Sequence, residues 1–419
     1  MAPIANSNRY MTRDTRFVNA NVVLPDRILS DASVQVQKGL IHQIDSTSNL
    51  SVTEDPTEVI DVEGDYLCPG FIDIHVHGGG GADFMDGNRK AFEKALRTHG
   101  THGTTSLVCT STVAQPEQIR IFLSLVREFK NTPTNRDLHP SARVLGAHLY
   151  GPYFRCEAIG CHPVDLYQIP DTDTYNSYLT FSEVIIKASI APELPESKAF
   201  AQACAKRGII LGVGHSLATF DQMVQALDWG IQYVDHLFCA MSDKSKLRQT
   251  QTYPMRGGVV EATLFLDQLS TEVIADGKHL SAELLLLAHK IKGEDRLAIV
   301  TDCNRALDMP DGEYIFGPEK NGQPFLHRDR VGLTLDGSSL ASSATGMDHH
   351  VRTFHRLTAL PLHTVVKMAS LTPARIIGYA DQLGSIEIGK IADLVILDQD
   401  LVIKSVHLSD RQPVQARIE

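Results

Sequence analysis

The sequence predicts an α/β protein: a (β/α)₈ TIM-type barrel with a small β-sandwich domain built from both chain ends. Two observations predict this architecture. Across the middle of the chain, eight short apolar runs alternate with longer stretches of helical periodicity. The two ends instead carry closely spaced strand-like runs. We assign residues 1–65 and 385–419 to the small domain and residues 66–384 to the barrel.

The terminal segments have the pattern of strands joined by hairpins. Their β-like runs are punctuated by Asn, Asp and Gly, the residues that tight turns favour. The N-terminal runs are RFVNANVVL, ASVQVQKGLIHQI and TEVIDVEG, and the C-terminal one is GSIEIGKIADLVILDQDLVI.

The barrel strands are expected in eight apolar runs: 67–77, 103–111, 142–150, 183–193, 208–216, 233–238, 271–279 and 297–303. Near-continuous apolar runs are typical of parallel strands that are covered on both faces. Amphipathic stretches such as 91–100, 198–208 and 281–293 separate several of them. A doubly wound open sheet is the alternative, but the count of eight favours a closed barrel.

Composition excludes several classes of function. The chain has 419 residues, a net charge of −11 and no basic stripe, so nucleic acid is not an expected partner. No run approaches the roughly 20 apolar residues that cross a bilayer, and the N-terminus lacks the apolar core of a signal peptide. Seven cysteines without paired short spacing indicate reduced thiols in a cytoplasmic protein.

Polar residues close most of the predicted strands. In a barrel of this type the active site lies at the C-terminal ends of the strands, so these residues are expected to meet there. They are His75, His77, His148, Tyr150, Glu193, His215, His236, Asp276, His279 and Asp302.

The stretch FIDIHVH is the clearest metal-binding signal. His75 and His77 lie two residues apart on a strand, so their side chains point to the same side, about 6.5 Å apart along it. Two such imidazoles can share one cation, and His215, His236 and Asp302 are expected at the same level. The four glycines 78–81 would turn the chain sharply and leave room over the metal. A lone histidine here would be read as a hydrogen-bonded core residue, but a cluster favours a metal.

A metal at this place predicts hydrolysis of an amide or related C–N bond. Bound Zn²⁺ lowers the pKa of a water molecule to about 7 and can polarise a carbonyl group. A neighbouring carboxylate can then accept a proton and pass it to a leaving amine. Asp302, which ends the last apolar run, is the residue we expect in this role.

These motifs resemble those of the N-acetylglucosamine-6-phosphate deacetylase family, within the metal-dependent amidohydrolase superfamily. The similarity extends from residue 68 to about residue 398. The matching stretches are CPGFIDIHVHGGGG, GAHLYGPYF, GCHP, SIAPE, VGHSLATFDQ, VDHLFCAM, IADGKHL, VTDC, LASSATGM and SLTPARIIGYADQLGSIEIGKIADLVILD.

The resemblance implies a role for each matching residue. His75 and His77 correspond to a metal-binding pair, His215 and His236 to two further metal ligands, and Asp302 to the catalytic aspartate. His279 resembles a residue that contacts the sugar and supports the transition state, and His162 resembles another substrate contact. The resemblance also implies a small-molecule substrate, a small β-domain and a homodimer.

Three departures from the family pattern stand out. Tyr150 replaces a metal-binding glutamate, because the chain has LYGP where LEGP is expected. Cys239, followed by Ala240, stands where the family usually has an asparagine in the segment that holds the sugar phosphate. Arg248 and Arg256 are the only arginine candidates for the phosphate in the segment that follows.

The loss of the glutamate predicts one metal ion. A tyrosine, with a reference pKa near 10, is neutral at pH 7 and bridges two cations poorly. We expect one zinc ion per chain on His75, His77, His215 and Asp302, with His236 beside the water, as in the mononuclear branch that includes adenosine deaminase. Glu193 or Glu157 could replace the missing carboxylate, and Tyr150 could be an oxyanion donor or a pocket wall.

Three functions remain open from the sequence. The first is a metal-dependent hydrolase that deacetylates an N-acetyl amino sugar, such as N-acetylglucosamine 6-phosphate. The second is an enzyme of the same fold with a changed substrate in a specialised pathway, which the three departures support. The third is a non-catalytic scaffold, which the retention of Asp302 disfavours.

Overall fold

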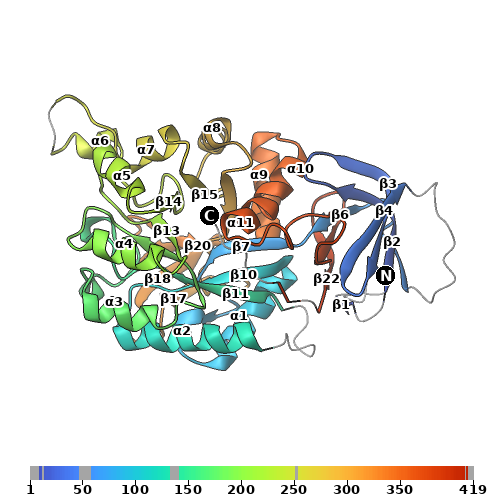
Figure 1. Cartoon of the computed structure of the whole chain (residues 1–419), viewed down its shortest axis with the longest axis horizontal. Coiled ribbons are helices and arrows are strands. Elements are labelled where there is room, and N and C mark those ends of the chain that lie inside the picture. The colour runs from blue at the N-terminus through green and yellow to red at the C-terminus, as the bar shows by residue number, and fades with distance from the viewer. Residues whose placement is uncertain are drawn as a thin grey trace.

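A parallel barrel and a mixed β-sheet lie side by side along the long axis of the protein (Figure 1). The computed structural model describes residues 9–11, 14–46, 58–132, 141–250, 253–410 and 412–413. The fold class expected from the sequence, a TIM-type barrel with an additional β-domain, is confirmed.

Eight strands form the barrel, and hydrogen-bonded neighbours are parallel in the order β16-β15-β14-β13-β12-β11-β10-β7. Each strand overlaps one of the eight predicted apolar runs, and nearly all of their side chains are buried. The strands are β7 (Phe71–Val76), β10 (Thr104–Thr110), β11 (Arg143–Leu149), β12 (Ile185–Ile190), β13 (Ile210–Val213), β14 (Ile231–Val234), β15 (Ser270–Ile274) and β16 (Leu297–Val300).

Backbone bonds just beyond the first and last strands close the barrel. The amide of Asp302 donates to the carbonyl of His75 at 2.9 Å, and the amide of His77 donates to that of Cys303 at 2.9 Å. The Thr301 hydroxyl also donates to Asp73 at 2.5 Å. The closure therefore places His75, His77 and Asp302 next to one another.

Helices cover the barrel strands on the outside (Figure 1). The three amphipathic stretches predicted at 91–100, 198–208 and 281–293 fall largely within α1, α4 and α8. The side chain of Asn88 caps α1 by accepting from the amide of Ala91 at 3.0 Å. The helices are α1 (Arg89–Thr101), α2 (Pro116–Asn131), α3 (Thr172–Leu179), α4 (Ser197–Ala205), α5 (Phe220–Leu227), α6 (Lys244–Leu247), α7 (Val259–Phe265), α8 (Ala282–Lys292), α9 (Met347–Thr358), α10 (Leu362–Met368) and α11 (Leu371–Ile376).

An antiparallel sheet of four strands is inserted after the last barrel strand, and the eight-run pattern did not predict it. It brings Phe316 and Ser342 to the mouth of the barrel, where the Phe316 ring packs 5.0 Å from that of His77. The strands are β17 (Gly312–Phe316), β18 (Gln323–Arg328), β19 (Val331–Thr334) and β20 (Leu340–Ser343).

Both chain ends contribute to the small sheet, as expected. The blue N-terminal strands and the red C-terminal strand β22 lie together at one end of Figure 1. The strand order is β1-β22-β21-β6-β2-β3-β4, with β5 paired to β2. These strands are β1 (Arg9–Tyr10), β2 (Thr15–Val23), β3 (Ile28–Gln37), β4 (Leu40–Ser46), β5 (Glu58–Asp61), β6 (Tyr66–Pro69), β21 (Leu394–Leu397) and β22 (Ile403–Leu408).

The chain passes from the small sheet to the barrel at Gly70, between β6 and β7. Strand β6 thus pairs within the small sheet although its residues fall in the range that we assigned to the barrel. A Cβ on Gly70 would lie 2.2 Å from the Thr105 hydroxyl oxygen, so a larger residue cannot occupy this crossing without displacing β10.

The described residues contain no helix long and apolar enough to cross a membrane. All seven cysteines are free, as the sequence analysis expected of reduced thiols.

A buried ion pair joins the barrel to the C-terminal segment and gives a first prediction. Arg143 Nη1, at the start of β11, lies 2.5 Å from Asp393 Oδ2, and both side chains are about 5% exposed or less. Asp393→Ala should lower the free energy of unfolding by about 3–5 kcal/mol, because it leaves the guanidinium buried without its carboxylate. Urea unfolding measures this loss. A change below about 1 kcal/mol would show that water or other groups replace the carboxylate.

Candidate active site

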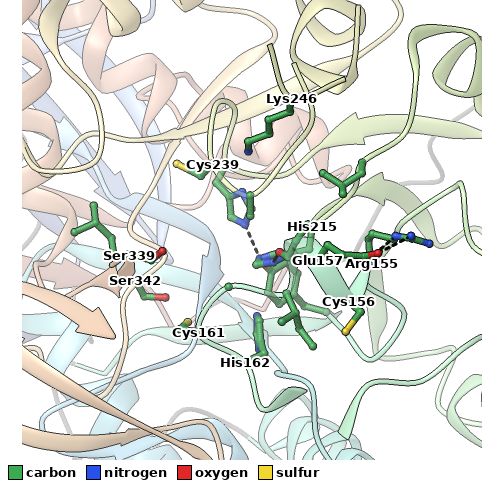
Figure 2. A pocket seen from close by; sticks show the side chains of 18 of the residues that line it. Arg155, Cys156, Glu157, Cys161, His162, His215, Cys239, Lys246, Ser339 and Ser342 are labelled. Carbon is green, nitrogen blue, oxygen red and sulfur yellow. Dashed lines mark hydrogen bonds and ion pairs between the residues drawn. The ribbon is translucent and has the colours of Figure 1, made fainter. Parts of the chain in front are cut away.

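A cavity of about 1270 Å³ opens at the C-terminal ends of the barrel strands. Most residues that the sequence singled out line it; His75 does not and lies in the barrel beneath. Figure 2 shows Lys246 and Cys239 on one side of the pocket, His162 opposite them, and Arg155 across from Ser342. The predicted residues in the lining are His77, Tyr150, His162, His215, His236, Cys239, Ala240, His279 and Asp302.

Two imidazoles of the first strand converge on one carboxylate. Asp302 Oδ1 lies 3.2 Å from His77 Nε2 and 3.6 Å from His75 Nε2. One potential ligand atom from each of His75, His236 and Asp302 lies within 4.8 Å of the others. His75 Nε2 and His236 Nδ1 are buried without a hydrogen-bond partner. Buried polar atoms are normally bonded, so these unpaired nitrogens are available to a ligand.

The spacing of these atoms fits a metal ion. Ligands at 2.0–2.1 Å around a tetrahedral Zn²⁺ lie roughly 3.4 Å from each other. The two distances from Asp302 Oδ1 to the imidazole nitrogens, 3.2 and 3.6 Å, bracket this value. Hydrogen bonding alone would pair His77 with Asp302 but would leave His75 Nε2 without a partner. The residues therefore fit a divalent cation held by His75, His77 and Asp302, with His236 close by.

The pKa values of these groups are shifted by burial and by one another's charges. Burial alone would raise the pKa of Asp302, but the neighbouring imidazoles, His75 first, lower it well below its usual range. Burial alone would lower the pKa of His75, but the Glu272 and Asp302 carboxylates outweigh burial and raise it. For His77 burial prevails over Asp302 and the pKa falls. Without a cation, Asp302 is thus an ionised acceptor of the histidine protons.

Three of the predicted ligands have left-handed backbone conformations. The φ angle is +47° at His215, +24° at His236 and +45° at Asp302. A non-glycine residue in this region costs on the order of 1–3 kcal/mol, and such strain gathers at functional sites. Each of these residues lies two positions beyond the end of its barrel strand. The left-handed turn there directs the side chain into the mouth of the barrel.

Tyr150 forms a hydrogen bond with the metal-site histidine His236. Its hydroxyl lies 2.7 Å from His236 Nε2, and burial raises the pKa of the phenol well above its ordinary value. The phenol is therefore neutral, and it occupies the direction in which Nε2 would otherwise bind a cation. The ring also packs against His75, 4.6 Å between centroids. Tyr150 is both a polar partner and a pocket wall.

His215 is close to the centre but does not belong to the group of converging ligand atoms. Its Nδ1 lies 2.6 Å from the carbonyl of Ala158, which fixes the proton on Nδ1. Its ring centroid lies 5.1 Å from that of His236. The ligand atoms that lie within 4.8 Å of one another thus include one from His236 and none from His215, whose Nε2 remains available toward the pocket.

His279 is held in place by Asp276, as the IADGKH stretch suggested. Asp276 Oδ1 accepts from the amides of Lys278 and His279, and Oδ2 lies 2.7 Å from His279 Nδ1. Burial alone would raise the pKa of Asp276, but the bonds from His279 outweigh it and lower the pKa. With its Nδ1 engaged, His279 has Nε2 left for a substrate in the pocket.

The other predicted contacts lie on the pocket wall. His162 Nδ1 accepts from the amide of Val113 at 3.3 Å, and its ring packs between those of His215 and Phe316. Cys239 follows the strained turn at His236, and burial raises the pKa of its thiol to about 12. Cys239 is thus a neutral wall residue rather than a nucleophile.

The two predicted phosphate arginines do not line the pocket. Arg256 forms an exposed ion pair with Asp221 at 2.6 Å, and Arg248 ends α6 outside the lining. Lys246, two residues earlier on α6, and Arg155 line the pocket instead. The sequence analysis missed both, because only the fold turns these positions inward.

Neither glutamate considered as a substitute ligand reaches the metal group. Glu193 accepts from the Ser216 hydroxyl at 2.7 Å and from the Leu217 amide at 2.6 Å. Glu157 pairs with Arg155 on the outer part of the pocket. Their carboxylates are engaged elsewhere, and neither takes the place of the missing glutamate.

Three charged residues beneath the histidines were also missed. Lys187 on β12, Asp235 after β14 and Glu272 on β15 are fully buried. Lys187 Nζ lies 3.2 Å from Asp235 and 3.3 Å from Glu272. Their signal in the sequence is a charged residue within an apolar run, as in EVIIKASI and TEVI. A charge buried in a strand needs a partner, and here the partners are on other strands.

The glycines after His77 form a turn rather than the floor of the pocket. Gly78 and Gly79 pair with Ala82 and Asp83 as a short hairpin. A Cβ on Gly78 would lie 2.2 Å from the carbonyl oxygen of Ala82, so the hairpin requires a glycine there. The sharp turn is confirmed. The glycines are absent from the pocket lining, so the expected space over the metal comes from the surrounding loops.

Comparison with known proteins points to one family. A sequence profile of the Amidohydrolase family matches residues 66–416. The N-acetylglucosamine-6-phosphate deacetylase of Lysinibacillus sphaericus is 32% identical over 358 residues, covering 84% of this chain and 86% of that protein. The N-acetylgalactosamine-6-phosphate deacetylase of Escherichia coli O157:H7 is 28% identical, covering 90% and 93%. The crystal structure of N-acetylglucosamine-6-phosphate deacetylase from Pasteurella multocida matches with a TM-score of 0.85 at 28% identity, covering 96% of this chain and 100% of that one.

Replacement of Asp302, one of the converging side chains, should strongly reduce metal binding. Asp302→Asn removes the only carboxylate of the group, and we expect the divalent metal content, measured by elemental analysis, to fall at least about tenfold. His162→Gln, on the pocket wall, is the control and should retain metal. Equal metal content in the Asp302 variant and the wild type would place the ion elsewhere.

Proposed function

Because the chain belongs to the Amidohydrolase family, and within it to the N-acetylglucosamine-6-phosphate deacetylase family, we propose that it removes the acetyl group from an N-acetyl amino-sugar phosphate. The protein is an enzyme, a metal-dependent hydrolase of an amide bond. The observation that carries the proposal is the convergence of His75, His77 and Asp302 at a pocket that His279 also lines.

The cation and Asp302 would have separate roles in hydrolysis, the first as a Lewis acid and the second in proton transfer. A divalent cation bound here supplies a Lewis acid that polarises the amide carbonyl and makes a water molecule more acidic. Asp302, ionised and 7% exposed, is positioned to accept the proton of the attacking water. The same carboxyl group then passes the proton to the leaving amine, so that acetate and the free amino sugar result.

His279 and Tyr150 are placed to stabilise the reacting carbonyl group. His279 lines the same pocket as His77 and Asp302, and its bond to Asp276 prevents its ring from turning. The Tyr150 phenol shares its hydrogen bond with His236 Nε2. If His236 Nδ1 faces the cation, Nε2 carries the proton and donates to the phenol oxygen. The phenol proton is then available for an oxyanion of the substrate.

Lys246 is the group that we propose for the sugar phosphate. It lies on the same side of the pocket as Cys239 (Figure 2), and Ala240, Gln249 and Thr250 also line the pocket. Its ammonium is 2.7 Å from the Met241 carbonyl, which holds it toward this end. Arg155 is the second cation of the lining, although Glu157 engages it.

One metal ion per chain, most simply zinc, is the second part of the proposal. The buried charge cluster, defined here as Lys187, Asp235, Glu272 and Asp302, carries three carboxylates and one ammonium. In their ionised forms they leave two negative charges, which one divalent cation offsets. A second cation would face its own repulsion in a buried site without a bridging carboxylate, because Tyr150 is neutral.

A changed substrate remains the alternative within the same reaction class. It is favoured by the position of Arg248 and Arg256 outside the pocket. It is also favoured by Cys239, which stands in the segment that holds the sugar phosphate in the family. We further propose a cytoplasmic location, which the seven free thiols support, and a homodimer. The exposed apolar residues Phe265, Leu286, Leu287 and Ile291 on α7 and α8 offer a surface for the dimer.

An acetate-release assay tests the substrate. With zinc-loaded protein we expect turnover of N-acetylglucosamine 6-phosphate, and at least about tenfold lower kcat/KM for unphosphorylated N-acetylglucosamine, since a charge-assisted contact is lost. Lys246→Met should reduce the preference for the phosphate, whereas the exposed Arg256→Met should not. Absence of turnover on glucosamine and galactosamine 6-phosphate derivatives would support the changed-substrate alternative.

The metal count is tested separately, by elemental analysis and by zinc titration of metal-free protein. The wild type should bind one equivalent, and Tyr150→Glu should bind up to two, because its carboxylate can bridge cations and no longer blocks His236. Tyr150→Phe, which removes the hydroxyl without adding charge, is the matched control and should stay at one. Two equivalents in the wild type would contradict the single-metal proposal.

A further inference from the structure

We propose that Glu272 is a positioning residue that sets the orientation of His75 for metal binding, and that Lys187 holds the Glu272 carboxylate in place in the barrel interior. This proposal rests on the metal site proposed above but not on the identity of the substrate. Glu272 belongs to none of the converging metal groups, and it lies on β15, across the barrel from β12 of Lys187.

The contacts of Glu272 are directed and complete. Oε1 accepts from His75 Nδ1 and, at 3.2 Å, from the amide of His236. Oε2 accepts from the Tyr233 hydroxyl at 2.5 Å and from Lys187 Nζ at 3.3 Å. One carboxylate thus binds the ring of one proposed ligand and the backbone of a second.

The bond to His75 has a chemical consequence at the opposite nitrogen. A carboxylate at Nδ1 holds the proton there, so the lone pair is on Nε2. Nε2 is the buried, unpaired nitrogen that lies 3.6 Å from Asp302. The ring can neither flip nor rotate without breaking the bond to Glu272. A carboxylate behind a ligating histidine also makes that histidine a more basic ligand.

Lys187 is the counter-ion that makes this arrangement possible. A fully buried carboxylate is costly unless a charge compensates it. The Lys187 ammonium lies within 3.3 Å of both Glu272 and Asp235, and 4.2 Å from the centre of the Tyr233 ring. Lys187 Nζ donates to Glu272 Oε2 at 3.3 Å, so the carboxylate oxygen that does not bond His75 also has a fixed partner.

A second metal site is the competing interpretation of the same region. Ligand atoms of His75, His148 and Asp235 also lie within 4.8 Å of one another, and both Asp235 oxygens lack a hydrogen bond. The Lys187 ammonium, however, lies 3.2 Å from Asp235 Oδ1 and would repel a cation there. His75 could not serve both sites, because its Nδ1 is bound to Glu272. The geometry favours a supporting network over a second ion.

Zinc affinity of the full-length protein tests the proposal, measured by competition with a chromophoric chelator. Glu272→Gln keeps an oxygen that can accept from His75, and we expect about tenfold weaker binding. Glu272→Leu removes the acceptor, and we expect about 100-fold weaker binding. The visible spectrum of the Co²⁺-loaded variants should change in the same order, because it reports the ligand geometry rather than stability.

The control is Asp393→Asn, which loses a buried ion pair far from the metal group. It should lower the unfolding temperature of the metal-free protein without changing zinc affinity. Zinc affinity within about threefold of the wild type in a folded Glu272→Leu, or in Glu272→Gln if the leucine variant does not fold, would overturn the positioning role. If the wild type itself binds no zinc, the metal site fails instead.

Discussion

The arrangement of buried charge at the barrel mouth is the constraint on which the rest of the site depends. Asp235 and Glu272 are fully buried, Asp302 is 7% exposed at the pocket, and the single ammonium of Lys187 lies beside the first two. Carboxylates in such places are costly unless cations or hydrogen bonds compensate them. Lys187 compensates Asp235 and Glu272, and the imidazoles of His75 and His77 face Asp302. In the proposed metal site a divalent cation completes this balance and links the stability of the barrel interior to its chemistry.

Closure of the barrel delivers these groups to one point. The backbone bonds between His75 and Asp302 and between His77 and Cys303 join the first strand to the segment after the last. The same residues that close the sheet therefore present the proposed metal-binding side chains, and their separation cannot vary without opening the barrel. The left-handed φ angles of His236 and Asp302 are held by this closed framework, which offsets their local strain.

Tyr150 changes the site without dismantling it. A neutral phenol has the volume and the hydrogen-bonding capacity to engage His236, but it has no charge with which to hold a second cation. The reaction class needs only one Lewis acid and one proton acceptor, and His75, His77 and Asp302 converge at a place that fits both. Under the single-metal proposal, the substitution changes the number of metal ions and not the kind of chemistry. Under the same proposal, Lys246 in the pocket lining replaces an arginine as the contact of the sugar phosphate.

The sequence by itself determined the eight strands and the pairing of the chain ends, and it singled out His75, His77, His236 and Asp302 as candidate metal ligands, because these follow from periodicity and from the places where apolar runs end. It could not show that Tyr150 reaches His236, that Arg248 and Arg256 turn away, or that Lys187, Asp235 and Glu272 meet. Those contacts join different strands and loops, and a side chain's partner across a barrel depends on register, strand tilt and backbone strain, none of which is written in local sequence. Only the tertiary structure decided them.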